Sequence, residues 1–178
     1  MHCEEIPVFL RKTTAVLATV AALSIGVVGT AQAARTLTYN LSGAAQYTAD
    51  IDAGAKVWND NVQNVKLVKT TSTRANIIIV ADDGWPRAQT TSLGNGRVWM
   101  GKQAIDQGYN KTRIAAHELG HILGLPDIKP GPCSSLMSGA SAGVPCTNPV
   151  PNAAEKSRVE RNFAGTAVVR TATFEDAA

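Results

Sequence analysis

The stretch AAHELGHILGLPD, Ala115 to Asp127, decides the fold, because it joins a helical pattern to a metal-binding pattern. His117 and His121 are four residues apart, so on a helix both imidazoles share a face and can reach one ion. Glu118 lies beside them, where the HExxH pattern of catalytic zinc sites has its general base. Such a site needs a third protein ligand and keeps one position open for water.

The first 33 residues have the pattern of an export signal rather than of a folded segment. Two basic residues precede the apolar run TTAVLATVAALSIGVVGT, and AQA, ending at Ala33, is a signal-peptidase pattern. The alternative, a membrane anchor, is less favoured because no positive stop-transfer cluster follows the run. We therefore expect residues 1–33 to be a signal peptide, and the protein to be secreted, extracellular and free of the membrane after cleavage.

Removal of that segment leaves two cysteines, Cys133 and Cys146. An even pair in an exported chain is most simply a disulfide. In the chain-entropy model, a bridge across so short a loop stabilises by about 3 kcal/mol. The alternative is that both thiols bind metal. Secretion and the Gly-, Pro- and Ser-rich loop between them favour the bridge.

The third metal ligand follows by elimination, because His117 and His121 are the only histidines after residue 33. With both thiols expected to be paired, a carboxylate is the remaining ligand type. Asp127 follows Gly124, where a left-handed conformation would turn the chain back beneath the ion. This spacing is that of the long metzincin motif with Asp in place of its third His. Met137 follows in SSLMSG, where metzincins carry a methionine beneath the zinc.

Hydrophobic periodicity predicts one α+β domain over residues 34–165. Apolar alternation or continuous apolar runs predict strands at residues 35–41, 65–69, 75–82, 87–91 and 96–101. The third of these is expected to be buried on both faces, because its apolar run is continuous. Helical spacing predicts helices at residues 47–60, 112–123 and 153–164, with caps at Thr48 and Asn152. The tail, residues 166–178, shows no pattern, and we expect it to be disordered.

The segments TRIAAHELGHILGLPD, GPCSSLMSG and CTNPVPNAAEKSRV resemble the snapalysin family of small secreted bacterial neutral metalloproteases. Weaker likeness in TLTYN, VWND and GRVWMG extends the resemblance over nearly the whole mature chain except the tail. The resemblance implies a metzincin-like zincin domain with a mixed twisted sheet, an antiparallel edge strand, an active-site helix and a C-terminal helix. It implies that Arg87 to Thr91 is that edge strand, along which an extended peptide substrate lies.

The resemblance also assigns roles to the residues of the site. It implies Zn²⁺ held by His117, His121 and Asp127, with Glu118 as the catalytic base. It further implies a disulfide between Cys133 and Cys146.

The chain departs from the family pattern in several places. Lys129 stands where family members often carry a tyrosine, two residues after the aspartate ligand. A family calcium site would here use Asn110 and Thr112, and the loss of a carboxylate at the first position weakens such a site. No pro-segment is evident between the cleavage site and the domain, and the tail after Gly165 is longer than the family pattern.

Together these features predict a zinc-dependent endopeptidase that hydrolyses peptide bonds of extracellular proteins, with a zinc-bound water activated by Glu118. We expect activity at neutral to mildly alkaline pH. The alternative is a catalytically weak or inactive zinc-fold protein that binds peptides. Lys129 supports this alternative, and the intact Glu118 argues against it. A purely structural zinc site would need a fourth protein ligand, and the sequence offers none near the motif.

The charge pattern excludes some partners. The net charge is only +3 and the basic residues are scattered, which argues against binding to nucleic acid. Protein or peptide substrates are the expected partners. Nothing in the sequence indicates an oligomer, so we expect a monomer.

Overall fold

The computed structural model of the chain describes residue 1, residues 33–165 and residues 172–175. Residues 2–32 of the predicted signal peptide, residues 1–33, lie outside the described part, so the signal peptide stays a prediction. Within the described ranges, no helix has the length and apolar character needed to cross a membrane.

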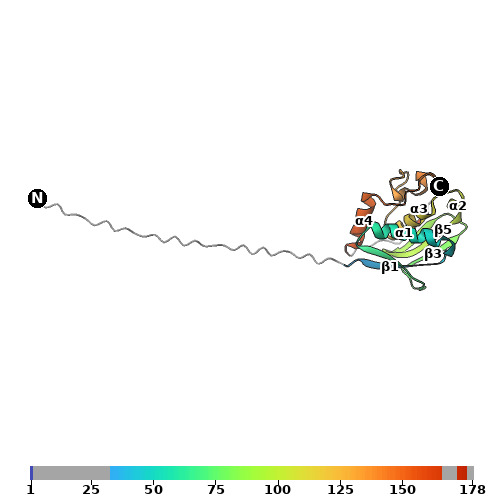
Figure 1. Ribbon diagram of the computed structural model, residues 1–178, viewed down its shortest axis with the longest axis horizontal. Helices are drawn as coiled ribbons and strands as arrows, with labels where there is room; N and C mark the ends of the chain where they lie inside the picture. The colour runs from blue at the N-terminus through green and yellow to red at the C-terminus, as the bar shows by residue number, and fades with distance from the viewer. Residues whose placement is uncertain (2–32, 166–171, 176–178) are drawn as a thin grey trace. The chain divides into compact units, whose positions relative to one another are not determined.

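The strands form one mixed, six-stranded sheet with the order β2-β1-β3-β5-β4-β6 (Figure 1). Parallel pairing joins β2, β1, β3 and β5, whereas β4 is antiparallel to both of its neighbours, β5 and β6. The strand bounds are β1 Arg35–Gly43, β2 Val65–Lys69, β3 Ile77–Asp82, β4 Arg87–Ser92, β5 Asn95–Gly101 and β6 Ala172–Glu175.

Helices α1 and α3 lie together on one face of the sheet, α1 against β2 and α3 against β4 and β5 (Figure 1). The helix bounds are α1 Thr48–Asn61, α2 Lys102–Asp106, α3 Lys111–Ile122 and α4 Ala153–Phe163, with 3-10 helices η1 Ala45–Tyr47 and η2 Leu136–Ala142. The two long helices cross closely, because a Cβ on Gly54 would lie only 2.9 Å from that of Ala115. Trp58 strengthens the crossing, since its indole N–H donates to the carbonyl of Ala116 at 2.8 Å.

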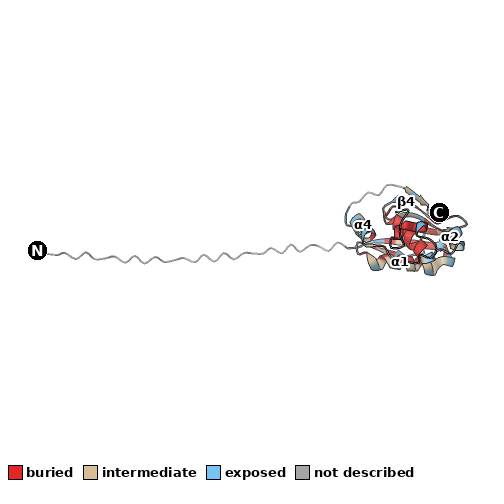
Figure 2. Cartoon of the chain, turned by 90° about the horizontal axis from the view of Figure 1, so that it is seen from above, coloured by how far each residue is buried: buried red, intermediate tan, exposed pale blue. Residues whose placement is uncertain are grey.

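The hydrophobic core lies between this sheet face and the two helices, where Figure 2 shows the buried residues gathered. Along β3, Ile77 and Ile79 are buried, whereas Ile78 and Val80 are only partly buried. The prediction that this strand is buried on both faces is therefore wrong. Alternate side chains point to opposite faces of a sheet, and α1 and α3 cover only one of them.

Helix boundaries agree with the predicted ones to within two residues, but one cap differs. Thr48 does not cap α1, because its hydroxyl donates to the carbonyl of Ala45 at 2.8 Å and so closes the preceding 3-10 turn. Asn152 caps α4 as predicted and forms a capping box with Glu155. Helix α2 was not predicted, since five residues are too few to show a helical period.

The predicted tail contains a strand that the sequence did not indicate. Ala172–Glu175 forms β6, with Phe174 opposite Ala88 and Ala172 opposite Thr90 of β4. Two expectations are corrected: this part of the tail is not disordered, and β4 is covered by β6 rather than being the edge strand. Four residues carry too little periodicity to reveal a strand, and the order comes from the hydrogen-bonding groups that β4 offers at its outer side. The predicted domain bounds otherwise stay predictions.

Candidate metal centre

Helix α3 brings both histidines into the interior of the domain. Its residues from Arg113 to Ile122 are all buried, and His117 and His121 are each 1% exposed. The helix begins at Asn110, whose side-chain oxygen accepts from the backbone N–H of Arg113 at 2.9 Å. Because the histidines are four residues apart, their side chains leave the helix on the same side.

The end of α3 turns the chain back toward those histidines, as the sequence predicts. Gly124 has a φ of +89°, a left-handed conformation that glycine adopts without strain. The N–H of Leu125 donates to the carbonyl of Gly120 at 3.0 Å, and the N–H of Gly124 to that of His121 at 2.9 Å. This pair of bonds is a Schellman motif, and it directs the following residues under the helix.

Asp127 thereby reaches the two imidazoles. Its Oδ1 lies 3.4 Å from Nε2 of His117 and 3.5 Å from Nε2 of His121, and the two Nε2 atoms are 3.1 Å apart. Oδ1 is buried and accepts no hydrogen bond of good geometry from the described residues. Two imidazole nitrogens and one carboxylate oxygen therefore converge, and no hydrogen bond of good geometry holds the carboxylate oxygen in place. This arrangement fits a bound metal ion.

Contacts of the two Nδ1 atoms fix the orientation and the tautomer of both imidazoles. Nδ1 of His117 lies 3.0 Å from the carbonyl oxygen of Leu136, and Nδ1 of His121 lies 2.8 Å from that of Leu125. A carbonyl only accepts, so each Nδ1 carries the hydrogen and each Nε2 keeps its lone pair. Backbone carbonyls orient metal-binding histidines in this way in many metalloproteins.

Burial and neighbouring charges favour the metal-binding protonation states. Burial lowers the pKa of His121, and the nearby His117 lowers it further, although Asp127 partly opposes the shift. Burial alone would raise the pKa of Asp127, but the two facing imidazoles outweigh it and hold that pKa far below its ordinary value. The centre therefore favours a neutral His121 beside an ionised carboxylate.

Glu118 is the remaining member of the cluster. It is 1% exposed, and one of its carboxylate oxygens lies within 4.8 Å of the ligand nitrogens of both histidines. A carboxylate at this position can accept a proton from a water molecule held between it and the histidines.

The loop that follows Cys133 contacts the centre through the carbonyl of Leu136, 3.0 Å from Nδ1 of His117, and carries the fully buried Met137. From α3, the guanidinium of Arg113 donates to the carbonyls of Ser135 and Leu136 at 2.8 and 3.3 Å. From α4, the Glu155 carboxylate accepts from the hydroxyl of Ser135 at 2.7 Å and from the N–H groups of Leu136 and Met137 at 3.2 and 2.9 Å. The loop is thus held from two helices at once.

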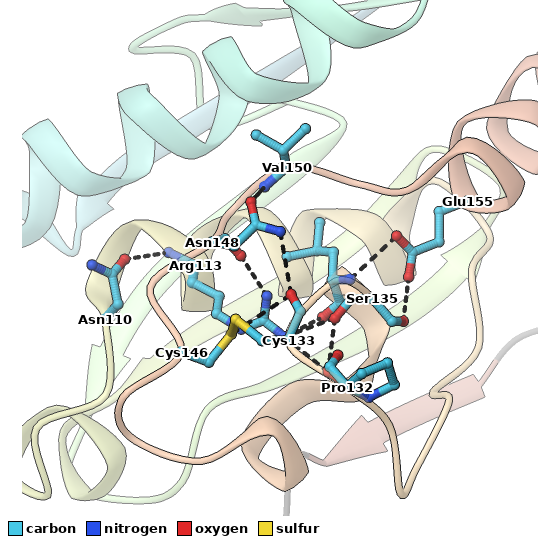
Figure 3. Close-up of a disulfide and its surroundings, with 11 residues drawn as sticks. Asn110, Arg113, Pro132, Cys133, Ser135, Cys146, Asn148, Val150 and Glu155 are labelled. Atoms are coloured by element: carbon cyan, nitrogen blue, oxygen red, sulfur yellow. Dashed lines mark hydrogen bonds between the residues drawn. A yellow bond between two sulfur atoms is a disulfide. The ribbon is translucent and has the colours of Figure 1, made fainter.

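The predicted disulfide closes the same loop. Cys133 and Cys146 are bonded, with their Cα atoms 5.5 Å apart (Figure 3). Asn148 adds a second link between the two ends of the loop, because its side-chain amide donates to the carbonyl of Cys133 at 3.2 Å. The alternative that these thiols bind metal is therefore wrong.

The structure gives no support to the predicted calcium site at Asn110 and Thr112. The side-chain oxygen of Asn110 caps α3, and the hydroxyl of Thr112 lies 3.4 Å from Asp50 Oδ1. The ammonium of Lys111 lies 3.3 Å from the other oxygen of Asp50, so a positive charge already neutralises this carboxylate.

Sequence reasoning missed Arg113 and Glu155, both buried charged residues that hold the loop. The signal for Glu155 was available, because Asn152 and Glu155 have the spacing of a capping box. No comparable signal marks Arg113. Lys129, singled out in the sequence, lies with its ammonium 3.6 Å from Oδ1 of Asp127.

Comparisons with known proteins agree with this geometry. A sequence model of the Streptomyces extracellular neutral proteinase (M7) family matches residues 34–166. The chain belongs to this family. It is therefore a peptidase of the M7 family, and the resemblance stated from the sequence is confirmed.

Individual M7 proteins show how far the similarity extends. The extracellular small neutral protease of Streptomyces caespitosus is 43% identical over 129 residues, which cover 72% of this chain and 97% of that protein. Its counterpart from Streptomyces lividans is 40% identical over 135 residues, covering 75% of this chain and 59% of that protein. The M7 match ends at residue 166, so strand β6 lies beyond it.

Proposed function

We propose that the chain is a secreted zinc-dependent endopeptidase that hydrolyses peptide bonds of extracellular proteins. The observation that carries the proposal is the convergence of two imidazole nitrogens and one carboxylate oxygen, 3.1 to 3.5 Å apart, beside the Glu118 carboxylate. His117, His121 and Asp127 would hold the metal. Zinc fits this donor set, since two imidazoles and a carboxylate leave a tetrahedral ion one open position. Secretion fits the relatives, which are named as extracellular proteases.

Each residue of the centre has a separate part in the proposed reaction. Zinc, when bound, would supply Lewis acidity toward the scissile carbonyl and the attacking water. Glu118 accepts the proton of that water as it attacks and returns a proton to the leaving amine. The backbone carbonyls of Leu136 and Leu125 keep the two imidazoles in the ligand tautomer. A peptide substrate can add as an extended strand along β4 only where β6 has left the outer side of that strand, because β6 pairs with the same backbone groups.

The mature protein should hydrolyse casein, and a zinc chelator should abolish the hydrolysis. Glu118→Gln should keep a full equivalent of zinc while losing casein hydrolysis by at least about a hundredfold, because the base contributes a factor of that order. Hydrolysis that persists in the chelated protein, or in Glu118→Gln, would refute the assignment.

The second candidate function, a peptide-binding protein without activity, rests on Lys129 beside the proposed ligand Asp127. The family match and the names of the relatives do not favour it. The casein measurement decides between the two, since a binding protein would retain zinc and peptide but release no fragments.

A further inference from the structure

Strand β6 lies at the outer side of β4, the side along which the proposed substrate would add. Its antiparallel register runs from Arg87 opposite Glu175 to Thr90 opposite Ala172. An added strand binds through the same backbone N–H and C=O groups that pair with β6. Occupation by β6 and by a substrate strand is therefore mutually exclusive.

The start of β6 is held by a side chain as well as by the strand ladder. Thr90 of β4 is fully buried, and its hydroxyl donates to the carbonyl of Ala172 at 3.1 Å. The same hydroxyl accepts from the N–H of Ala172 at 3.0 Å. These two bonds fix the position of β6 along β4.

Phe174 of β6 also covers part of the metal centre. Its ring is stacked on the imidazole of His121, with the ring centroids 4.2 Å apart and the planes 6° from parallel. With this ring in place, His121 is only 1% exposed. A scissile peptide bond has to approach the same group of ligands, and the aromatic ring lies against one of them.

We propose, on the basis of the proposed protease function, that the C-terminal strand is a built-in competitive inhibitor. It occupies the substrate side of β4 while Phe174 covers His121. The tether to α4 gives the strand a high effective concentration, so that even weak pairing competes with free substrate. Release of β6 opens both β4 and the metal centre. The strand thus regulates access and is not part of the catalytic machinery.

Kinetics on the mature, zinc-loaded chain test the inhibition. If β6 is docked for nine tenths of the time, Phe174→Ala raises kcat/KM for an internally quenched peptide about tenfold, through KM with kcat unchanged. The matched control is Thr173→Ala, in the same strand but with an exposed side chain, and it should leave kcat/KM unchanged. An unchanged kcat/KM in Phe174→Ala would overturn the proposal.

A peptide added in trans keeps the test independent of how the variants fold. A synthetic TATFEDAA peptide, residues 171–178, should competitively inhibit the full-length mature Phe174→Ala chain, which has lost its own aromatic ring against His121. The same peptide with alanine in place of the phenylalanine should inhibit several-fold less. Equal inhibition by both peptides, or none by either, would overturn the role of Phe174.

Hydrogen exchange separates this proposal from the proposed function. In the Glu118→Gln background, the β4 amides that face β6 should exchange slowly, and adding Phe174→Ala should accelerate them. Equal exchange in the two proteins would overturn docking of the strand. If no zinc-loaded form cleaves any peptide, the protease function fails, and exchange alone then shows whether β6 covers β4.

Discussion

The sulfur of Met137 lies 2.8 Å from the point where a Cβ on Gly120 would stand, so α3 and the loop beneath it touch without an intervening side chain. Trp58 approaches the same point to 3.1 Å, and both Trp58 and Met137 are fully buried. Gly120 lies between the two histidines in the sequence. The close packing of α3 against Met137 and Trp58 therefore depends on this glycine.

Gly120→Ala should destabilise the protein, although alanine is the better helix former. Helix propensity favours alanine by about 1 kcal/mol, but overpacking against Met137 and Trp58 costs about 2 kcal/mol. The net loss should lower Tm by a few degrees in a thermal unfolding experiment. Gly165→Ala is the control, since a Cβ there meets no atom within 4 Å. A Tm for Gly120→Ala at or above that of the parent would contradict this packing.

Glu155→Gln should cost about 3 kcal/mol in the free energy of unfolding. The buried carboxylate accepts from Ser135, Leu136 and Met137, and an amide nitrogen in its place would face donors instead of acceptors. Urea denaturation measures the loss. Asp60→Asn, the same change at an exposed carboxylate of α1 that forms an ion pair with Lys56, should cost well under half as much. Equal losses in both variants would show that Glu155 does not hold the loop.

The sequence was sufficient to predict what depends on local pattern. HExxH on a periodic helix, a glycine stop and a carboxylate at a fixed spacing predict the convergence of His117, His121 and Asp127, because helix geometry and one turn determine it. The capping residue Asn152 and the paired cysteines were predictable for the same reason. Each of these features rests on spacing within a short segment.

What the sequence did not predict depends on contacts between distant segments. Arg113 and Glu155 meet the loop around Met137 only after two helices have packed. The capping-box spacing marks Glu155 as a partner of Asn152, but no local spacing marks the contact of either residue with the loop. The pairing of β6 with β4 joins residues more than eighty positions apart and has no sequence period of its own. The partial exposure of Ile78 depends on which sheet face the helices cover.

Activity should be retained at pH 6.5 and fall steeply by pH 5. The lowered pKa of His121 keeps its imidazole neutral below the ordinary value of 6.5, and protonation at lower pH competes with the metal. The lowered pKa of Asp127 keeps it ionised throughout this range, so histidine determines the loss. The stability of the metal-free protein should change in the same direction. Its free energy of unfolding decreases as pH falls below 6.5, because His121 binds a proton more readily in the unfolded chain than in the folded one. A rate at pH 5 equal to that at pH 7 would refute the assignment.

Lys129→Met should increase zinc affinity several-fold. The ammonium lies 3.6 Å from Oδ1 of Asp127, and a cation there repels a bound divalent metal. Competition with a fluorescent chelator measures the affinity, and kcat on a peptide substrate provides a second measurement. Unchanged zinc affinity together with a large loss of kcat would instead show that Lys129 supports negative charge on the substrate during reaction.

The zinc content of Asp127→Ala, measured beside Asp106→Ala as a control for an exposed carboxylate, tests the metal centre most directly. The parent and the control should each retain one equivalent of zinc after dialysis, because Asp106 lies in α2 and forms an exposed ion pair with Lys102. Asp127→Ala should lose it, since two imidazoles alone do not hold a catalytic zinc. One full, tightly held equivalent in Asp127→Ala, or none in the parent, would contradict the account.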